Sequence, residues 1–434
     1  MNEKYSAPKG TRDFAPGSLE VKNKIIDIIE EVYSLYGFKA WDGPCFENIE
    51  TLTKKSGDEI KSQIYNFMDK GNRELGLRFD LTTSLARIIA SNNNLKRPIK
   101  TYNVGKAFRY ENPQAGRYRE FFQMDADIFG STNNSTECEL LCMIDEVLTR
   151  VGFADFIIEL NDRGLLVELV TYAGIDEAKT TEVIRVIDKY AKIKKEGVYA
   201  ELEKLGVEND KIDRLFELIS VEGSNEEKFA FFEEKMCENE NAMKVIKNLK
   251  EILAKVSGES VESKIVFKPS LVRGQDYYTG TIFEYIVVGG ANVGAVGGGG
   301  RYDTYVESFG GIPTPAIGCS FGIERIIDWI SGNEKMKAKL LGKNKSVFVA
   351  NFDASTFDDA AKLVSYLRKN GVSSCYDLNN RKYNKQFNYA CDCEFGYFVT
   401  VGEDEVKTGV YSVKDLYTKT EQKLTKEEII NLAK

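Results

Sequence analysis

The sequence of 434 residues contains no histidine. Histidine is the side chain most often used for acid–base catalysis near neutral pH, and it is the commonest metal ligand. Its absence excludes catalytic triads and metal sites that depend on imidazole. Any chemistry must therefore use arginines, carboxylates, bound metal ions or the substrate's own groups.

The sequence also lacks the usual features of zinc proteins and membrane proteins. The eight cysteines are scattered, with Cys391 and Cys393 close together, and no C-x-x-C spacing occurs. Structural or free thiols are therefore expected rather than a zinc site. No apolar run approaches the ~20 residues of a membrane span, and residues 1–14 lack the apolar core of a signal peptide. We expect a cytoplasmic protein that does not contact membranes.

The overall charge is acidic. The 59 basic and 67 acidic residues give a net charge of -8, which argues against non-specific coating of nucleic acid. The net charge does not exclude a local basic patch that docks one RNA, because the electrostatic field at the surface depends on where the charges lie. With 42% apolar and 29% charged residues, the chain is typical of globular proteins, and its length predicts two to four domains.

Hydrophobic periodicity predicts an α+β domain over 1–330. Helical spacing is expected in 19–37, 137–151 and 319–331. Residues 175–260 are rich in Lys and Glu with helical periodicity, which favours a helical insertion over a continuation of the same core. Strand-like segments are expected at 38–48, 77–81, 100–111, 117–129, 154–160, 265–269 and 281–288.

A second, smaller domain is predicted at the C-terminal end. Residues 331–345 contain several Lys and Gly residues and are predicted to be a linker. From 346 to 434, strand-like and helix-like segments alternate. This alternation indicates a small α/β domain.

The stretch from Arg109 to Asp127 carries charges of both signs around a turn signal at 113–116. Alternate residues of a strand face opposite sides, so Arg109 and Glu111 are expected on one face before the turn. After the turn, a packed face alternates with a polar face that carries Arg117, Arg119, Phe121, Gln123, Asp125 and Asp127.

This ordered face fits a ligand that is anionic at one end and cationic at the other. Arginines bind phosphate with a planar fork, and carboxylates and amides accept hydrogen bonds from an ammonium or a ring N–H. Exposed ion pairs on a solvated face are the alternative for any single pair. The whole ordered set, with a turn between its halves, favours ligand binding.

The stretch is part of a pattern that resembles the class II aminoacyl-tRNA synthetases, and specifically the histidyl-tRNA synthetases. FRYENPQAGRYREFFQMDADIFG is similar to motif 2 of that class, and LVRGQDYYTGTIFEY resembles the histidine-specific motif. GGGGRYD with PAIGCSFGIERI resembles motif 3. Further similar strings, in the family's order, are PKGTRDF, RFDLTTSLAR and GVYSVKDL.

The resemblance implies a fold and a reaction. The fold would be a class II catalytic domain built on an antiparallel sheet, with a C-terminal anticodon-binding α/β domain over 346–434. The reaction would be that of a histidine–tRNA ligase, in which L-histidine and ATP give histidyl-adenylate and pyrophosphate. The histidyl group would then pass to the 3′ end of tRNA(His). Such catalysis relies on positioning and charge stabilisation, so a chain without histidine loses nothing essential.

The resemblance assigns four residues to ATP. Arg109 would hold the α-phosphate and Glu111 the adenine end. Arg117 would meet the β- and γ-phosphates, and Arg325 the γ-phosphate from the opposite side. A helix-surface cation is the alternative for Arg325. Mg²⁺ is expected with the polyphosphate, and no protein side chain is assigned to it.

Arg273 is the second expected catalytic residue beside Arg109. The family uses this arginine to stabilise charge on the α-phosphate while the adenylate forms. The adjacent Gly274 permits close approach of backbone to ligand. A structural ion pair between Arg273 and Asp276 is the alternative.

The resemblance also implies a histidine-binding set. Its polar groups would pair both ring nitrogens, so phenylalanine and glutamine would leave buried partners unpaired and be rejected. Core packing is the alternative for each tyrosine taken singly. The implied residues are Asp80, Thr82 and Gln123 around the α-ammonium, Asp127, Tyr277, Tyr278 and Tyr302 around the imidazole, and Arg109 and Arg273 at the reacting end.

Contacts to tRNA and to a second copy of the chain follow from the same resemblance. Gln114, at the tip of the motif 2 loop, and Arg119 are expected to contact the tRNA acceptor end. For most positions of the insertion, a solvated face is favoured over tRNA contact. Pro44, after the first helix, resembles the proline of motif 1 and implies a homodimer with an isologous interface.

Two other classes of protein share parts of this pattern. The regulatory subunit of ATP phosphoribosyltransferase keeps the synthetase fold but generally lacks the anticodon domain and degrades the histidine-specific motif. A module that senses uncharged tRNA would normally lie beside a kinase domain, whose signature is not visible here. The presence of 346–434 and of Arg273, Tyr277 and Tyr278 favours the synthetase.

The missing histidines suggest a hypothesis about expression. A histidine–tRNA ligase without histidine could be synthesised when histidine is scarce, and Phe122 stands where the family commonly has histidine. A histidine-poor proteome is the alternative. Histidine usage in the organism's other proteins decides between the two, because uniformly low usage contradicts the special-purpose explanation.

Overall fold

A computed structural model describes residues 5–55, 57–275, 277–289 and 294–434. The chain divides into two compact units, Met1–Leu340 and Leu341–Lys434. Helix α13 (Glu334–Leu341) lies within the stretch whose composition predicts a linker. The lysines of that stretch are therefore carried in large part on a helix.

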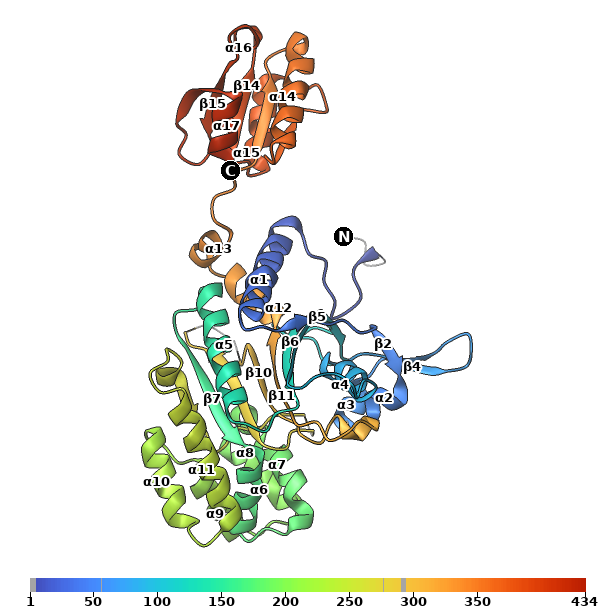
Figure 1. Cartoon of the computed structure of the whole chain (residues 1–434), viewed down its shortest axis with the longest axis vertical. Helices are drawn as coiled ribbons and strands as arrows, with labels where there is room; N and C mark the ends of the chain where they lie inside the picture. Colours follow the sequence, from blue (N-terminus) through green and yellow to red (C-terminus); the bar gives the residue numbers. More distant parts are fainter. Residues whose placement is uncertain (1–4, 56, 276, 290–293) are drawn as a thin grey trace. The chain divides into compact units, whose positions relative to one another are not determined.

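The first unit is built on one eight-stranded sheet (Figure 1). All inner strand pairs are antiparallel, and only the two edge pairs, β1 with β5 and β7 with β8, are parallel. The α+β class predicted from the sequence is therefore confirmed. In sheet order the strands are β1 (Lys39–Ala40), β5 (Ile99–Phe108), β6 (Glu120–Phe129), β11 (Ala316–Gly322), β10 (Gly297–Arg301), β9 (Thr281–Val287), β7 (Phe156–Asp162) and β8 (Ile265–Phe267).

Three amphipathic helices pack together beside the sheet. Helix α1 (Pro16–Leu35) contacts both α12 (Ile323–Ser331) and α5 (Ser135–Val151). Its apolar residues recur at helical spacing, and Val21, Ile25, Ile29 and Val32 are fully buried. Burying each such side chain contributes roughly 1.5–3 kcal/mol, so this helix anchors the layer that supports β6 and β11.

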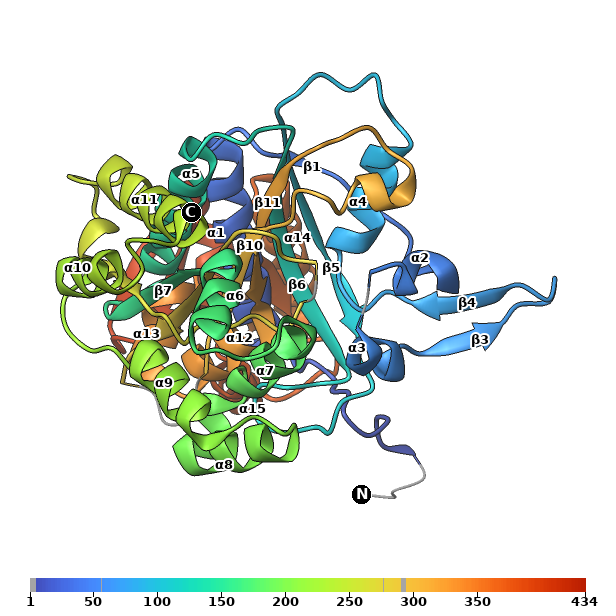
Figure 2. The same cartoon turned by 90° about the horizontal axis from the view of Figure 1, so that it is seen from below.

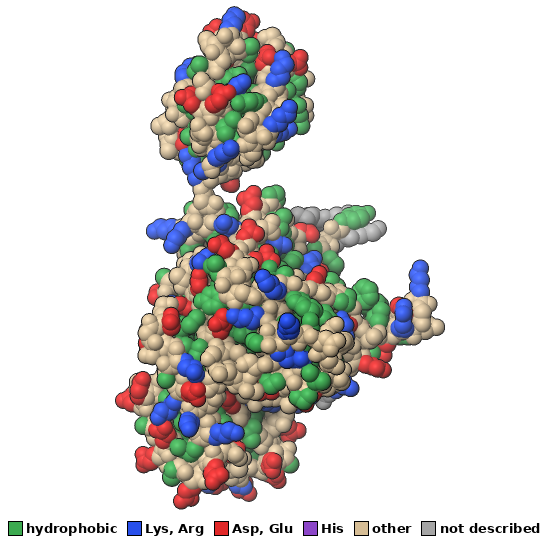
Figure 3. Space-filling view, in the orientation of Figure 1, with side chains coloured by type: hydrophobic (Ala, Val, Ile, Leu, Met, Phe, Trp, Pro, Cys, Tyr) green, Lys and Arg blue, Asp and Glu red, His purple; other side chains and the backbone are tan. Residues whose placement is uncertain are grey.

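A second group of helices covers the far end of the sheet. Figure 2 shows α6 to α11 together on one side, with β3 (Asn66–Met68) and β4 (Glu74–Leu77) projecting on the other. Figure 3 shows acidic and basic side chains interspersed over this helical region. The helices are α6 (Arg163–Tyr172), α7 (Thr180–Ile187), α8 (Tyr190–Lys204), α9 (Asn209–Ile219), α10 (Asn225–Lys235) and α11 (Glu240–Lys255).

A small three-stranded sheet lies near the opposite end of the unit. Its order is β2-β4-β3, and both pairs are antiparallel. Helix α4 contacts α2, which packs on β2 and β4. The elements are β2 (Phe46–Asn48), α2 (Ile49–Thr53), α3 (Asp58–Gln63), β3 (Asn66–Met68), β4 (Glu74–Leu77) and α4 (Thr82–Ala90).

Three predicted elements differ from the structure, and one of them, the predicted strand 77–81, overlaps β4 (Glu74–Leu77) only at Leu77. The predicted strand 38–48 is split into β1 and β2, because Pro44 lies between them and cannot donate a ladder hydrogen bond. Residues 319–322 were expected to be helical, but they complete strand β11. A short apolar run next to a helix does not distinguish the two states by periodicity alone.

The second unit is a five-stranded mixed sheet with helices. Its order is β13-β12-β14-β15-β16, with parallel pairs at β13–β12–β14 and antiparallel pairs thereafter. The α/β architecture expected for the C-terminal domain is what this topology shows. The elements are β12 (Val347–Asn351), α14 (Phe357–Lys369), β13 (Ser374–Tyr376), α15 (Tyr383–Asp392), β14 (Tyr397–Val401), α16 (Glu403–Thr408), β15 (Val410–Asp415), β16 (Glu421–Thr425) and α17 (Lys426–Ala433).

Candidate active site

The first unit contains a cavity of ≈ 2180 Å³ over the central strands of its sheet. Strands β6, β9, β10 and β11 contribute side chains or glycines to its wall, and the loops 109–118 and 270–278 contribute others. The cavity brings together all but one of the sequence-predicted site residues: Asp80, Thr82, Arg109, Glu111, Gln114, Arg117, Gln123, Asp127, Arg273, Tyr277, Tyr278, Tyr302 and Arg325.

Strand β6 forms the acidic side of the cavity. Gln123, Asp125 and Asp127 alternate along it and face the cavity, while Met124 and Ala126 are fully buried on the other face. The alternation read from the sequence therefore holds in the structure. Gly318 on β11 is the register partner of Asp127, and a Cβ at this position would lie 1.9 Å from Asp127 Oδ1. Glycine is required there because the carboxylate occupies that space.

Three carboxylates are buried at this end. Asp80, Asp125 and Asp127 are 3%, 2% and 1% exposed. Burial raises the pKa of Asp125 to about 7, and the neighbouring Asp80 adds to the rise. Burial, and then the charge of Asp125, raise the pKa of Asp127 well above its ordinary value. Burial also raises the pKa of Asp80, although hydrogen bonds from Thr83 oppose the rise.

A group of tyrosines closes the same end. Tyr302 donates its hydroxyl to Asp127 Oδ1, and the ring of Tyr277 stacks on Tyr305 with centroids 4.5 Å apart. Tyr278 lies against Tyr277, with centroids 5.0 Å apart. These rings are at most 8% exposed, and Tyr277, Tyr278 and Tyr302 also line the cavity, so these three are both packed core aromatics and part of the wall of a polar pocket.

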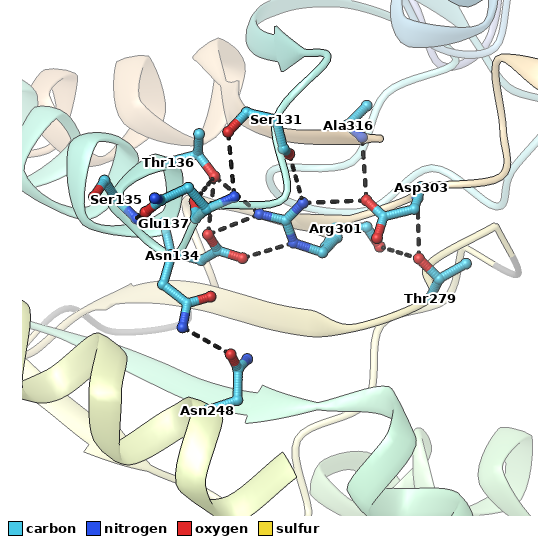
Figure 4. Close-up of polar contacts among 11 residues, drawn as sticks. Ser131, Asn134, Ser135, Thr136, Glu137, Asn248, Thr279, Arg301, Asp303 and Ala316 are labelled. Carbon is cyan, nitrogen blue, oxygen red and sulfur yellow. Dashed lines mark hydrogen bonds and ion pairs between the residues drawn. The ribbon is translucent and has the colours of Figure 1, made fainter. Parts of the chain in front are cut away.

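A buried ion pair fixes the backbone that carries Tyr302. Arg301 ends strand β10, and its Nε and Nη2 donate to the two oxygens of Glu137 on α5 at 2.7 and 2.8 Å (Figure 4). Glu137 is 0% exposed. The same guanidinium donates to the Ser131 carbonyl at 3.0 Å and to Asp303 at 3.1 Å. Arg301 thus holds the neighbouring Tyr302 in position next to Asp127.

The opposite end of the cavity is rich in arginine. Arg109 donates its Nε to the Phe79 carbonyl at 2.9 Å, which orients its fork toward the cavity. The carboxylate of Glu111 pairs with both neighbouring arginines: Oε1 lies 3.9 Å from Arg109 Nη1, and Oε2 lies 3.6 Å from Arg117 Nη1. Gln114 and Arg117 form the bridge at the tip of the hairpin. The residues before and after the turn therefore converge on one side of the cavity.

Helix α12 brings a further arginine and an acid. Arg325 donates to the carbonyls of Ala295 and Gly116. Burial and then the charge of Arg117 lower the pKa of Arg325, although the charges of Glu284 and Glu111 oppose the shift. Glu324, 3% exposed, accepts the Phe122 N–H with both oxygens at 2.8 Å.

Arg273 lies between the two ends, paired with Glu284 of β9. Burial would lower its pKa, but the charge of Glu284 more than offsets this and raises it. A Cβ on Gly298 would lie 2.6 Å from Arg273 Nη1, so the guanidinium rests directly on the glycine strand β10. Asp276, the alternative partner, lies outside the described residues.

Comparison of this chain with family models and with known proteins shows the family to which it belongs. A model of the family described as "Histidyl-tRNA synthetase" matches residues 10–326, and one described as "Anticodon binding domain" matches 346–434. The "Histidine--tRNA ligase" of Pyrococcus abyssi is 35% identical over 94% of this chain and 94% of the relative. That of Methanococcus maripaludis is 35% identical over 99% of this chain and 100% of the relative. The chain belongs to the histidyl-tRNA synthetase family.

Solved structures agree with this membership. The crystal structure of histidyl-tRNA synthetase from Nostoc sp. PCC 7120 has a TM-score of 0.84 and 26% identity, covering 99% of this chain and 98% of that one. A Bacillus halodurans structure described as an ATP phosphoribosyltransferase regulatory subunit/histidyl-tRNA synthetase has a TM-score of 0.74 at 20% identity. The latter shows only that the fold is shared.

Arg119 is the one predicted site residue that the structure does not bring to the cavity wall. Strand β6 begins only at Glu120, so Arg119 does not follow the strand alternation. Its Nε donates to the Glu111 carbonyl at 3.0 Å, and its guanidinium lies 4.0 Å from the centroid of the Tyr110 ring. In this synthetase-family chain, Arg119 braces the hairpin.

Sequence reasoning missed three acids of the site as functional candidates. Asp125, Glu284 and Glu324 all line the cavity. The period-2 pattern placed Asp125 on the face expected to bind a ligand, but sequence reasoning assigned it no role. The pairings of Glu284 with Arg273 and of Glu324 with the Phe122 backbone join distant segments, so no local signal predicts them.

The helical insertion contributes lysines to the rim of the cavity. Lys189, Lys192, Lys194 and Lys195, at the start of α8, line it. Lys189 pairs with Glu201 at 2.7 Å, and Lys194 has φ 60° and ψ -177° inside the helix, a region that side chains other than glycine rarely adopt. All four lysines are solvent-exposed, as expected for a solvated face, and they also lie at the rim of the cavity.

We predict that Glu324→Gln changes the pH dependence of stability. Burial raises the pKa of Glu324 to about 7, so the folded state binds more protons than the unfolded chain between roughly pH 4 and 7. The free energy of unfolding of the wild type therefore falls as pH rises through this window. The variant should gain roughly 2–4 kcal/mol relative to wild type between pH 5 and pH 8.

Urea unfolding at several pH values measures this difference. Glu31→Gln is the matched control, because it makes the same chemical change at a side chain that is 66% exposed rather than buried. A pH-independent difference for Glu324→Gln would contradict the prediction.

Proposed function

We propose that the chain is a histidine–tRNA ligase, which activates L-histidine with ATP and transfers it to tRNA(His). One observation beyond family membership carries the proposal. A single cavity has three buried carboxylates at one end and Arg109, Arg117 and Arg325 at the other, with Arg273 between them. A cationic amino acid and an anionic nucleotide fit these ends.

The first step follows from this arrangement. A carboxylate oxygen of histidine attacks the α-phosphorus of ATP, the bond to the β-phosphate oxygen breaks, and pyrophosphate leaves. Arg109 and Arg273 stabilise the charge that develops on the α-phosphate. Arg117 and Arg325 hold the departing phosphates, and Glu111 holds the adenine end. Asp80, Thr82 and Gln123 hold the α-ammonium, and Asp127 with Tyr277, Tyr278 and Tyr302 hold the ring.

Mg²⁺ accompanies ATP in this proposal. Within the described ranges, no group of three or more Cys, Asp or Glu side chains is placed to hold a metal ion. Mg²⁺ would therefore take most of its ligands from the phosphates and water, and the arginines would bind the remaining phosphate oxygens. When bound, the ion neutralises the polyphosphate.

The second step uses tRNA. The 3′-terminal hydroxyl attacks the histidyl carbonyl carbon, and AMP leaves. Gln114 at the hairpin tip and the unit 341–434 are the proposed contacts to the acceptor end and the anticodon. Arg119 would contribute through the hairpin that it braces.

We also propose a homodimer in the cytoplasm. Pro44 follows α1, and the nearby small sheet exposes Phe46, Phe67 and Met68 by 52%, 43% and 59%. An isologous interface would cover such apolar side chains. None of the helices in the part of the chain that the structure describes is long and apolar enough to cross a membrane.

Aminoacylation of tRNA tests the proposal. We expect the full chain to convert labelled histidine and tRNA into acid-precipitable histidyl-tRNA with ATP and Mg²⁺, and to stop when EDTA is added. A folded protein that charges no tRNA under these conditions would favour the regulatory paralogue instead.

A further inference from the structure

The segment 8–14, PKGTRDF, has no part in the proposed reaction, yet it packs against the hairpin that carries Arg117. The Arg119 N–H donates to the Gly10 carbonyl at 2.7 Å. Gly10 has φ +83°, and a Cβ there would lie 2.7 Å from the Arg119 side chain and 2.9 Å from that of Pro113. The segment therefore contacts the hairpin on both sides of its tip, and glycine is required at the point of contact.

Arg12, in the same segment, joins the hairpin to helix α12. Its Nη1 donates to Asp328 Oδ1 of α12 at 2.7 Å and to the Tyr118 hydroxyl at 3.1 Å. The Tyr118 hydroxyl in turn donates to Asp328 Oδ2 at 3.2 Å. Side chains from three separate segments of the chain thus form a closed triangle of hydrogen bonds. We call Arg12, Tyr118 and Asp328 the Arg12 clamp.

Aromatic rings orient the guanidinium of Arg12 within this clamp. Its Cζ lies 4.4 Å from the centroid of the Tyr118 ring and 4.5 Å from that of the Phe14 ring. Lys22 of α1 lies 4.8 Å from the centroid of the same Phe14 ring. Cations within about 6 Å of a ring centroid are attracted by the ring. Arg12 is therefore held by stacking as well as by hydrogen bonds.

The Arg12 clamp lies next to the two arginines proposed to bind the departing phosphates. Asp328 follows Arg325 by three residues on α12, so both lie on one side of the helix. Tyr118 directly follows Arg117, and the carbonyl of Gly116, which precedes Arg117, accepts from Arg325 Nε at 3.3 Å. Both chain neighbours of Arg117 are therefore bonded to α12. All five residues line the cavity.

Arg117 and Arg325 need this support because they carry like charges. Burial and then the charge of Arg117 lower the pKa of Arg325, and Glu284 and Glu111 offset only part of the shift. The two cations therefore repel each other before ATP binds. Moving the hairpin away from α12 would relieve the repulsion, but it would also break hydrogen bonds of the Arg12 clamp.

We propose that Arg12 is a positioning residue for ATP, because the Arg12 clamp fixes the spacing between Arg117 and Arg325 before the nucleotide binds. Preorganised cations bind phosphate more tightly, since no binding free energy is spent on bringing them together. The inference rests on the proposed function, in which these two arginines hold the β- and γ-phosphates. The clamp should therefore act on the binding of ATP and not on the binding of histidine or AMP.

Equilibrium binding of ATP and of AMP to Arg12→Ala, measured by calorimetry with Mg²⁺, tests the proposal. ATP should bind roughly 10- to 100-fold more weakly than to the wild type, because misplacing a positioned group by about 1 Å can cost up to about 100-fold. AMP, which lacks the β- and γ-phosphates, should bind as it does to the wild type. Equal weakening of both nucleotides, or of neither, would overturn the positioning role.

Kinetics of ATP–pyrophosphate exchange give a second readout. In Arg12→Ala the KM for ATP should rise while the KM for histidine and kcat stay near wild type, as expected when binding common to the ground state and the transition state is lost. Tyr118→Phe keeps the ring but removes the hydroxyl from the clamp, so it should raise the KM for ATP by a smaller factor. An equal rise in the KM for histidine would indicate general damage and contradict the proposal.

Arg381→Ala is the matched control. Arg381 pairs with Asp377 at 2.7 Å, lies 4.2 Å from the centroid of the Tyr389 ring and is 28% exposed, against 23% for Arg12. It belongs to the other unit, and neither assay contains tRNA, so ATP binding and exchange should match the wild type.

The outcomes separate this inference from the proposed function. A folded wild-type protein without histidine-dependent exchange would overturn the proposed function and the inference with it. Normal exchange by the wild type, with an unchanged KM for ATP in both Arg12→Ala and Tyr118→Phe, would overturn the inference alone.

Discussion

Arg273→Ala is expected to lower histidine-dependent ATP–pyrophosphate exchange by roughly 10²- to 10³-fold, the loss typical when one preorganised transition-state donor is removed. Arg273 lies against Gly298, where a Cβ would lie 2.6 Å from its Nη1, and Glu284 holds it there. Its guanidinium is therefore fixed before substrate binds. Stability should change little, because the Glu284 side chain left behind is 25% exposed.

Arg150→Ala is the matched control for this prediction. Arg150 also pairs with carboxylates, Glu31 at 3.0 Å and Glu146 at 2.6 Å, but it lies on the exposed side of α5. The control should keep wild-type exchange. If exchange by Arg273→Ala stays within about threefold of wild type, well short of the loss expected for such a donor, Arg273 does not take part in adenylate formation.

Glu137→Ala is expected to lower the free energy of unfolding by about 3–5 kcal/mol. The substitution leaves Arg301 buried, with its two strongest acceptors removed and only the Ser131 carbonyl, the Thr136 hydroxyl and Asp303 remaining. Because Arg301 orients Tyr302, the KM for histidine should also rise. Urea unfolding and exchange kinetics measure the two effects.

Replacing both Glu137 and Arg301 distinguishes two effects: the loss of their ion pair, and the burial of an unpaired arginine charge. The double variant Glu137→Leu, Arg301→Met should regain most of the lost stability, since apolar residues of similar volume often substitute for a buried pair at little cost. It should not regain the KM, because the hydrogen bonds that orient Tyr302 are gone. A loss below about 1 kcal/mol for Glu137→Ala would show that this pair behaves like an exposed one.

The local pattern of polar and apolar residues in the sequence predicted those parts of the site that lie on a single strand or turn. The two-residue period of 120–129 placed Gln123 and Asp127 on the cavity face, and the hairpin turn brought Glu111 toward Arg117. The same alternation does not hold for Arg119, because strand β6 begins one residue after it, at Glu120. Helix and strand were also confused at 319–322, where β11 runs directly into α12.

Long-range pairings could not be predicted. Glu284 with Arg273, Glu324 with the Phe122 N–H, and Glu137 with Arg301 are joined only by the folded sheet and its helices. Each is a buried charge that needs a partner, but the sequence does not identify which distant residue provides it. The fold class was predictable because it depends on many weak periodic signals rather than on one contact.

The absence of histidine also shapes the acid–base behaviour of the protein. The groups expected to titrate near neutral pH are carboxyls whose pKa burial raises to about 7, such as Asp125 and Glu324. Both line the candidate site. The pH dependence near neutrality should therefore report on this cavity rather than on surface imidazoles.

The most direct test is ATP–pyrophosphate exchange by the full chain with each of the twenty amino acids. The proposed function predicts Mg²⁺-dependent exchange with histidine alone, because another side chain would leave the buried polar groups proposed to pair with the ring nitrogens, among them Asp127 and Tyr302, without partners. Exchange with a different amino acid, or with none in a protein that is shown to be folded, would contradict the assignment of this cavity to histidine activation.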